Sequence, residues 1–396
     1  MSSASSKKVV CFFLIVFFQI TEAVHVKWSG SSRFESFYQE EQNYYSSFYF
    51  NLKPQIHIID GLFFNTRFDL INFERKEDDF WKNLLFQQRA SLLSQRGFVF
   101  LYKDSSKNKK LSFPFLFPSQ FYLDYELEFF KFRIGRAPYH FGLGTNYSAT
   151  NSPFDLWMNI TDQISFYMEY QFFYLQPSFF HQMQAFQSSL SEGILSALLQ
   201  GGFKKTNWQV SFLYEYILEE DKNSFVEVYG EYQEQNWKTK LSSSYIFSEN
   251  TSLSVAFEGV YHVPAKFPMD LELKAGGLIG SASFNPQYNL SLILQNRWMK
   301  TEEFNNNFSS YQIAQAQIKE SFYVSPRFTL SLLKENLKLQ PLFLLASSLD
   351  GKQWSYEGDL YLKYRAYKKL FFHLKGGILY QKDWTFSLLA QAAASF

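Results

Sequence analysis

The sequence predicts an all-β chain that forms a transmembrane up-and-down antiparallel β-barrel after a cleaved signal peptide. Three observations lead to this prediction. The first 23 residues have the order of a secretory signal, long segments alternate apolar with polar residues, and the last segment ends on an aromatic residue, Phe396.

The amino-terminal segment begins with a short polar stretch that contains Lys7 and Lys8. An apolar run over residues 9–18 follows, and the segment ends on small residues up to Ala23. This order is typical of a secretory signal peptide. The apolar run is shorter than the roughly 20 residues that cross a bilayer as a helix, and a polar stretch follows it at once, which disfavours an uncleaved anchor. We therefore expect a signal peptide over residues 1–23 and one domain over residues 24–396.

Charge and cysteine usage restrict the classes of partner. The net charge is +1, and loss of residues 1–23 would remove two lysines and one glutamate, which leaves a formally neutral chain. Nucleic-acid binders normally carry a marked basic excess, so no nucleic-acid partner is expected. The one cysteine, Cys11, lies in the predicted signal peptide. The rest of the chain can hold neither a disulfide nor a thiolate metal site, and we expect no metal and no cofactor.

The composition favours strands with two different faces. One fifth of the residues are aromatic, yet the mean hydropathy is −0.23. No run of 18 apolar residues follows the signal peptide, which excludes spanning helices. Over residues 354–365 one parity is mainly apolar and aromatic, whereas the other carries Ser, Glu, Asp, Lys and Arg. Side chains of a strand point alternately to opposite faces, so such a segment is a strand with one apolar side.

The lengths and spacing of these segments predict a membrane barrel. Tilted strands that cross a bilayer need about 9 to 11 residues, and short polar turns such as residues 350–352 separate the segments. A sheet in lipid must leave no unpaired edge, so it has to close, with roughly 16 to 20 strands and about 18 as the preferred number. Aromatic residues at segment ends predict girdles at both membrane surfaces. The segments are residues 48–58, 121–129, 164–174, 208–218, 237–247, 251–263, 271–279, 288–298, 354–365, 370–380 and 384–396.

The carboxyl-terminal segment resembles the assembly signal of Gram-negative outer-membrane barrels. It alternates up to a terminal aromatic residue, Phe396, although Ala394 stands where that signal usually has a second aromatic residue. The resemblance implies an outer-membrane location, contact with outer-membrane lipid, and recognition of Phe396 by the barrel-assembly machinery.

A second resemblance covers residues 134–144 and extends to Asp155 and Asp162. A strand end Gly-Arg-x-Pro, which contains Arg136, precedes an aromatic-Gly pair and a long loop with an Asp. This pattern is similar to porin-type and alginate-export-like barrels, which implies a channel and, by analogy, a homo-trimer. The loop, residues 139–160, either folds into the lumen, with Arg136 paired to Asp155 or Asp162, or forms an ordinary extracellular loop.

The parity opposite each apolar face predicts a charged lumen. Charged side chains are costly in lipid and readily accommodated in a water-filled channel. The predicted function is passive diffusion of small hydrophilic solutes across the outer membrane, without enzymatic chemistry. Both signs of charge occur, so the preferred ion is left open. The candidates for lining or constricting the pore are Lys131, Arg133, Arg136, Asp155, Asp162, Arg297, Glu357, Asp359, Lys363, Arg365 and Lys375.

Two other functions fit the same fold. One is a barrel with a structural or surface-recognition role and a blocked lumen. The other is a barrel phospholipase that uses a Ser-His pair, for which His140 and His181 are the residues to test. Neither histidine lies in a nucleophile motif, so the channel is the preferred interpretation.

Overall fold

A computed structural model describes most of the chain after the predicted signal peptide, which itself lies outside the described residues. The described ranges are 25–39, 43–73, 92–94, 98–103, 113–144, 147, 149, 157–182, 194–218, 224–247, 251–264, 268–279, 321–380 and 383–396.

The regular structure in these ranges consists of strands. They are β1 (His25–Gln39), β2 (Asn43–Ile59), β3 (Leu62–Phe73), β4 (Leu92–Ser94), β5 (Phe98–Lys103), β6 (Phe113–Glu126), β7 (Phe130–Pro138), β8 (Trp157–Tyr170), β9 (Phe173–Gln182), β10 (Ile194–Lys204), β11 (Trp208–Ile217), β12 (Ser224–Glu234), β13 (Trp237–Phe247), β14 (Ser252–Val263), β15 (Met269–Ile279), β16 (Ser321–Leu332), β17 (Leu337–Ser348), β18 (Trp354–Tyr367), β19 (Leu370–Tyr380) and β20 (Trp384–Ser395).

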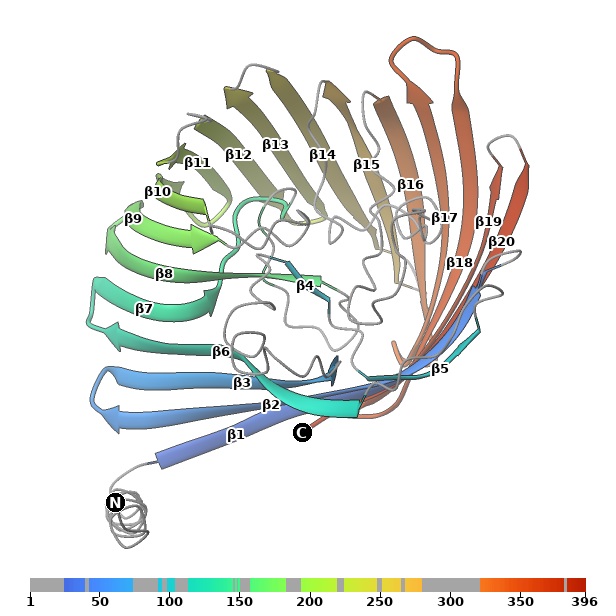
Figure 1. Ribbon diagram of the computed structural model, residues 1–396. Coiled ribbons are helices and arrows are strands. Elements are labelled where there is room, and N and C mark those ends of the chain that lie inside the picture. Colours follow the sequence, from blue (N-terminus) through green and yellow to red (C-terminus); the bar gives the residue numbers. More distant parts are fainter. Residues whose placement is uncertain are drawn as a thin grey trace, which may run out of the picture.

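The strands form a closed antiparallel barrel (Figure 1). From β6 to β20 each strand pairs with its neighbour in sequence, β3 pairs with β6, and β1 pairs with both β2 and β20. The ring therefore contains 18 strands, which confirms the preferred strand number. Because every strand of the ring has two partners, the sheet leaves no long open edge.

Two short strands lie outside the ring. β5 pairs with residues 44–48 of β2, and β4 pairs with residues 157–159 of β8. β2 pairs with β3 only from Asn51 onward, so β5 takes the position next to β2 where β3 has separated from it. The predicted strand at residues 288–298 lies outside the described residues.

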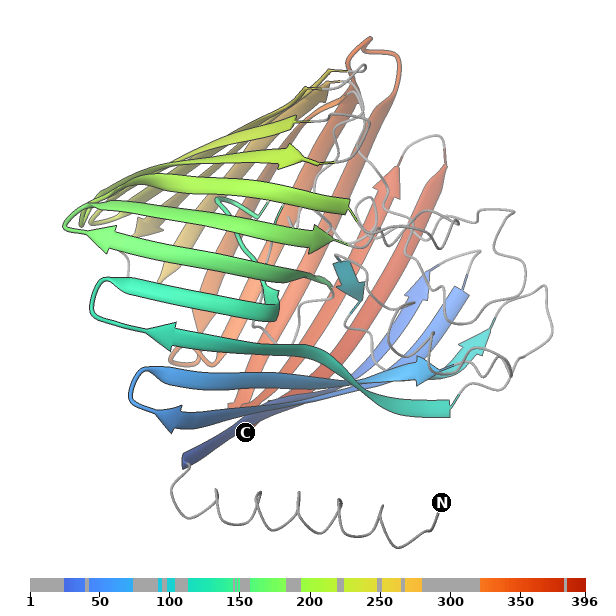
Figure 2. The same ribbon diagram turned by 60° about the vertical axis from the view of Figure 1, so that its left-hand side comes forward.

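Short turns join the strands at one end of the barrel (Figure 2). Two of these turns lie inside segments that were predicted to be single strands. Residues 127–129 form a turn within the predicted segment 121–129, and residues 171–172 form one within 164–174, so both predictions are wrong at these ends. Exposed aromatic residues continue the alternation through both turns, so the sequence pattern hides the strand ends. At the other end, the predicted turn at residues 350–352 is confirmed, and Gly351 has the left-handed φ of +69° that favours glycine.

The two faces of the ring differ in polarity as the alternation predicts. On β11, for example, Phe212 and Tyr214 are exposed on the outer face, whereas Ser211, Leu213 and Glu215 are buried on the inner face. In the described residues no helix is long and apolar enough to span a membrane. An outer face of this kind belongs in lipid, where a closed barrel satisfies its backbone hydrogen bonds internally.

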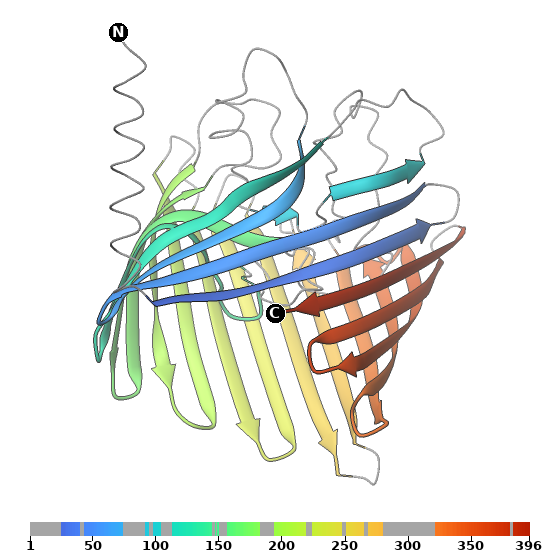
Figure 3. The same cartoon turned by 90° about the horizontal axis from the view of Figure 1, so that it is seen from below.

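The barrel closes where the last residue meets the first strand (Figure 3). The backbone N–H and C=O of Phe396 exchange hydrogen bonds with those of Gly30, both 3.1 Å long. The Phe396 ring stacks on Phe50 and covers Gly30 so closely that a Cβ there would lie 2.5 Å from a ring carbon. Glycine at position 30 therefore makes room for the terminal ring.

Candidate functional site in the barrel lumen

The loop after β7 folds back into the barrel (Figure 1). Its residues Tyr139, Phe141 and Tyr147 are buried in a cluster with inner-face side chains of β9 to β12. The cluster also contains Phe180, Leu198, Leu213, Phe225 and Tyr229. Of the two conformations left open by the sequence, the structure has the one in which this segment enters the lumen.

Two phenol groups attach this loop to polar residues of the inner face. Tyr139 donates a hydrogen bond of 2.8 Å to Oε1 of Gln200, and Tyr147 donates one of 2.5 Å to Oε2 of Glu215. A hydrogen bond to a charged acceptor is stronger than one between neutral groups. The loop is therefore held by both ring packing and hydrogen bonds.

Glycine makes the turn of this loop possible. Gly142 and Gly144 have φ values of +56° and +75°, which side chains other than glycine rarely adopt. A Cβ on Gly142 would also lie 3.2 Å from side-chain atoms of Glu227 and Tyr229 on β12. The glycines thus allow both the turn and its close approach to the inner face.

Charges of opposite sign alternate around one part of the inner face. Nζ of Lys240 lies 2.6 Å from Glu258, and Nζ of Lys274 lies 3.5 Å from the same carboxylate. Glu272 in turn contacts Lys274 at 3.6 Å and Arg327 at 3.5 Å. We call this group the paired wall, and it consists of Glu231, Lys238, Lys240, Glu258, Glu272, Lys274 and Arg327 on β12 to β16.

The inner face of β17 to β19 carries basic residues in adjacent positions. Lys338 lies opposite Lys363 in the register of β17 and β18, and Lys375 lies opposite Tyr361 in that of β18 and β19. Nζ of Lys375 is 5.1 Å from the centre of the Tyr361 ring. Within the described residues no carboxylate forms an ion pair with these three lysines. We call Lys338, Lys363 and Lys375 the basic wall.

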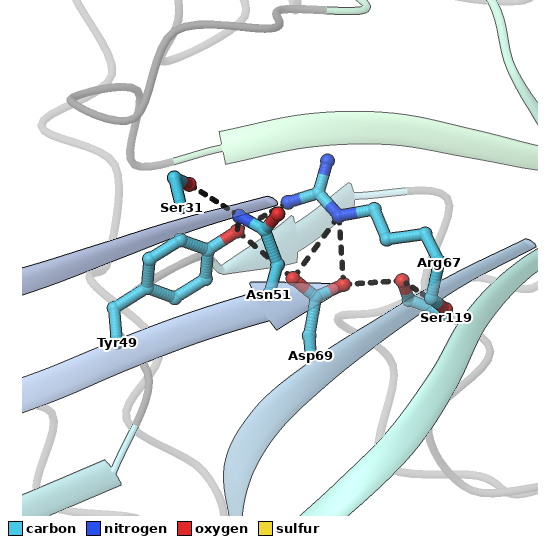
Figure 4. Close-up of polar contacts among 6 residues, drawn as sticks. All are labelled: Ser31, Tyr49, Asn51, Arg67, Asp69 and Ser119. Carbon is cyan, nitrogen blue, oxygen red and sulfur yellow. Dashed lines mark hydrogen bonds and ion pairs between the residues drawn. The ribbon is translucent and has the colours of Figure 1, made fainter. Parts of the chain in front are cut away.

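A buried polar network joins the first strands of the ring (Figure 4). Nε of Arg67 lies 3.0 Å from both carboxylate oxygens of Asp69, and Nη2 of Arg67 donates a hydrogen bond of 2.5 Å to the Tyr49 hydroxyl. That hydroxyl donates one of 2.9 Å to Asp69, and Ser119 of β6 donates another to the same carboxylate. The network therefore connects β2, β3 and β6 across the inner face.

Asn51 extends this network to β1. Its amide nitrogen donates hydrogen bonds of 2.6 Å to Ser31 and of 2.7 Å to Tyr49. Asn51 is also the residue of β2 that pairs with Asp69 of β3, next to the point where β5 replaces β3 as the partner of β2. The network thus fixes the inner face at the place where the sheet divides.

Two candidate residues at the start of β7 lie on the inner face as predicted by their parity. Arg133 forms two hydrogen bonds with the carboxylate of Asp124, at 2.7 and 2.9 Å. Lys131 lies 3.1 Å from Asp124 and also contacts Glu126. These pairs are local contacts between β6 and β7, and their role in a constriction stays a prediction.

The structure places two other candidates on the outer face. Arg136 has the parity of the exposed residue Ile134, and Asp162 has that of Ile164. Arg136 does pair with Asp162, through hydrogen bonds of 2.7 and 2.9 Å, but this pair faces away from the lumen. The predicted pairing with Asp162 therefore occurs on the outer face and not in the lumen, because one residue of offset moves a strand side chain to the opposite face. The alternative partner, Asp155, lies outside the described residues.

The candidates of β18 and β19 share the inner face. Glu357 and Asp359 are buried there, and Lys363 and Lys375 belong to the basic wall. Arg365 has the same parity and donates a hydrogen bond of 3.1 Å to Asn336 in the turn between β16 and β17. The last two candidates, Asp155 and Arg297, lie outside the described residues.

Sequence reasoning missed several inner-face charges. Arg33 and Glu35 form an ion pair of 3.2 Å on β1, and Gln391 of β20 donates a hydrogen bond of 2.6 Å to Glu35. Arg67 and Asp69 were missed in the same way. The signal was available, because both pairs occupy alternate positions between aromatic and apolar residues in segments 25–39 and 62–73.

Comparison with known proteins identifies the type of barrel. No protein family and no curated protein matches the sequence. Among solved structures, Pseudomonas aeruginosa OccK11 (OpdR) is similar, with a TM-score of 0.61 and 9% identity over 95% of this chain and 96% of that chain. A BenF-like porin from Pseudomonas fluorescens Pf-5 has a TM-score of 0.60 and 8% identity over 95% of this chain and 99% of that chain. The chain has a porin-type fold.

Pseudomonas aeruginosa OccK7 (OpdD) shares this porin-type fold, with a TM-score of 0.60 and 11% identity over 94% of this chain and 98% of that chain. At such identity the similarity extends to the architecture and not to individual side chains. The charges and the loop described above are therefore interpreted from this chain alone.

Proposed function

We propose that the protein is a porin of the outer membrane, through which small hydrophilic solutes diffuse passively. The observation that carries the proposal is the contrast between the two faces of the 18-strand ring, apolar outside and rich in charged and hydroxyl side chains inside. Barrels of about 16 to 18 strands leave an aqueous channel between their inner side chains. Passage needs no covalent step, and the proposal assigns no catalytic residue.

The arrangement of luminal charges supports a preference for anions. In the paired wall each basic side chain contacts a glutamate, and three glutamates neutralise most of the charge of its four basic residues. The lysines of the basic wall face the lumen without such partners among the described residues. A ring or cluster of lysines is a common means by which channels select anions.

The folded loop supports a narrow passage in place of an open tube. Phe141 and Tyr147 bring the chain after β7 against the inner face of β9 to β12, which reduces the free cross-section on that side. Solutes would then pass between this loop and the opposite side of the lumen, where the basic wall lies.

The test is a recording of the refolded chain in planar bilayers, followed by measurement of the reversal potential in a salt gradient. We expect discrete conductance steps and a reversal potential that indicates higher anion permeability. Absence of any conductance from a correctly folded barrel would contradict the channel and favour the structural or surface-recognition role. Conductance with cation preference would contradict only the role of the basic wall.

Assembly of the barrel through its last strand forms a further part of the proposal. Phe396 completes the pairing of β20 with β1 through Gly30. The machinery that inserts such barrels would recognise this strand before it pairs, as the resemblance of the terminal residue implies.

A further inference from the structure

One tyrosine lies where the paired wall meets the basic wall. Tyr361 belongs to β18, and its neighbours in register are Gln340 of β17 and Lys375 of β19. Its side chain has inner parity yet is only 2% exposed. Nζ of Lys375 lies 5.1 Å from the centre of its ring, and Cζ of Arg327 lies 5.8 Å from the same centre. The ring therefore contacts one cation of each wall.

The contact with the ring leaves the charge of Lys375 intact. An aromatic ring attracts a cation that lies over its face within about 6 Å of its centre. The ring has no net charge, so it holds an ammonium group without cancelling the field of that group, whereas a carboxylate would cancel most of it. Arg327 also contacts Glu272 at 3.5 Å, but Lys375 forms no ion pair with a described carboxylate. Of the two cations, Lys375 is therefore the one that keeps its full field in the lumen.

A carboxylate lies within reach of Lys375 on the same face. Asp359 precedes Tyr361 by two residues on β18, so it is a diagonal neighbour of Lys375. Diagonal neighbours of an antiparallel pair are about 7 to 8 Å apart, which a long side chain can span. The residue of β19 opposite Asp359 is Gly377, which has no side chain to separate the two groups. Oδ2 of Asp359 instead accepts a hydrogen bond of 3.1 Å from the Tyr361 hydroxyl. Tyr361 thus contacts both members of an ion pair that does not form.

We propose that Tyr361 is a positioning residue for anion selectivity, because its ring holds the Lys375 ammonium away from the Asp359 carboxylate. The inference rests on the proposed function, in which the basic wall favours anions. Lysine carries its charge on a flexible four-carbon stem, so without the ring the ammonium of Lys375 would reach Asp359. The resulting ion pair would cancel most of the field that Lys375 contributes to the solute path. Tyr361 therefore keeps one charge of the basic wall available to a passing anion.

Reversal potentials of Tyr361 variants in a salt gradient test this role. Tyr361→Leu removes the ring, and we expect the anion over cation permeability to fall roughly twofold, as it would in Lys375→Gln. Tyr361→Phe keeps the ring, so its permeability ratio should lie closer to that of the unmodified chain than to that of Tyr361→Leu. The matched control is Tyr174→Leu, because Tyr174 is a buried inner-face tyrosine of β9 whose hydroxyl donates a hydrogen bond of 2.6 Å to Ser211. This control should leave the ratio unchanged.

A double-mutant cycle with Asp359 separates positioning from a merely structural role. Asp359→Asn removes the carboxylate that would capture Lys375, and this variant alone should raise the anion preference because the lumen loses a negative charge. In the Asp359→Asn background, Tyr361→Leu should cause no further change in the permeability ratio. A structural role of Tyr361 would instead lower the ratio equally in both backgrounds. Heat-modifiable migration of each variant checks that the barrel is folded.

The following outcomes would overturn the proposal. An unchanged ratio in folded Tyr361→Leu, while the unmodified chain prefers anions, would exclude the positioning role and leave the proposed function intact. An equal fall with and without Asp359→Asn would show that this carboxylate does not compete for Lys375. A ratio in Tyr361→Phe as low as in Tyr361→Leu would exclude the ring as the group that holds the ammonium. Absence of anion preference in the unmodified chain would contradict the role of the basic wall, and this inference with it.

Discussion

On β12 to β16 every basic side chain of the paired wall contacts a glutamate, whereas on β17 to β19 the lysines of the basic wall lie beside one another. Both groups face the same lumen from neighbouring strands of one sheet. The difference shows that strand parity decides which residues enter the lumen, and that register between strands decides whether their charges cancel. Net charge of the whole chain, which is +1, reveals neither property.

The largest expected effect is on ion selectivity, after removal of charge from the basic wall. Lys363→Gln/Lys375→Gln removes two positive charges that form no ion pair with a described carboxylate. Each charge changes the energy of an ion 6 Å away by about 0.7 kcal/mol in water, and salt screens part of this. We expect anion over cation permeability to fall roughly threefold, as measured by the reversal potential. An unchanged ratio would exclude the basic wall from the solute path.

A smaller effect, on single-channel conductance, is expected when the loop after β7 no longer packs against the inner face of β9 to β12. Phe141→Ala/Tyr147→Ala removes two buried rings from the cluster, and a single buried Phe→Ala change costs about 3 to 5 kcal/mol in a core. We expect higher single-channel conductance with little change in ion preference. Phe212→Ala, an aromatic truncation on the outer face of β11, is the control and should leave conductance unchanged. Unaltered conductance in the double variant would mean that the loop does not narrow the path.

The smallest change in selectivity is expected for a charge-neutral variant of the paired wall. Lys240→Gln/Glu258→Gln removes one charge of each sign, so anion preference should stay as in the unmodified chain. Glu258→Gln alone leaves both Lys240 and Lys274 without that carboxylate and should destabilise the barrel by about 1 to 3 kcal/mol. Denaturant unfolding in lipid vesicles measures the free energy of unfolding of the two variants, and we expect Glu258→Gln to be the less stable one. A double variant less stable than the single one would contradict the pairing.

Strand parity explains how much of this could be predicted from the sequence. The alternation correctly placed the side chains of Lys131 and Arg133 on the inner face. The same alternation, continued along β7, places Arg136 on the outer face. The error arose because Arg136 was interpreted through a motif and not through its position on the strand. Alternation is a local property, so it could have been applied throughout.

Contacts between distant segments could not be predicted in this way. The hydrogen bond from Tyr147 to Glu215 joins residues 68 positions apart and depends on how the loop folds across four strands. Likewise, the separation of β2 from β3 at Asn51 follows from competition with β5 for the same edge. Such features depend on register and on packing in three dimensions, which no periodicity encodes.

The contact between Phe396 and Gly30 joins the last strand of the ring to the first, so the ring can close only after the whole chain has been synthesised. Strand β1 is synthesised before the other strands of the ring but receives its second neighbour, β20, last, so every folding intermediate without β20 exposes the unpaired edge of β1. A stop codon upstream of β20 would leave the edge of β1 unpaired, and such fragments should aggregate or be degraded.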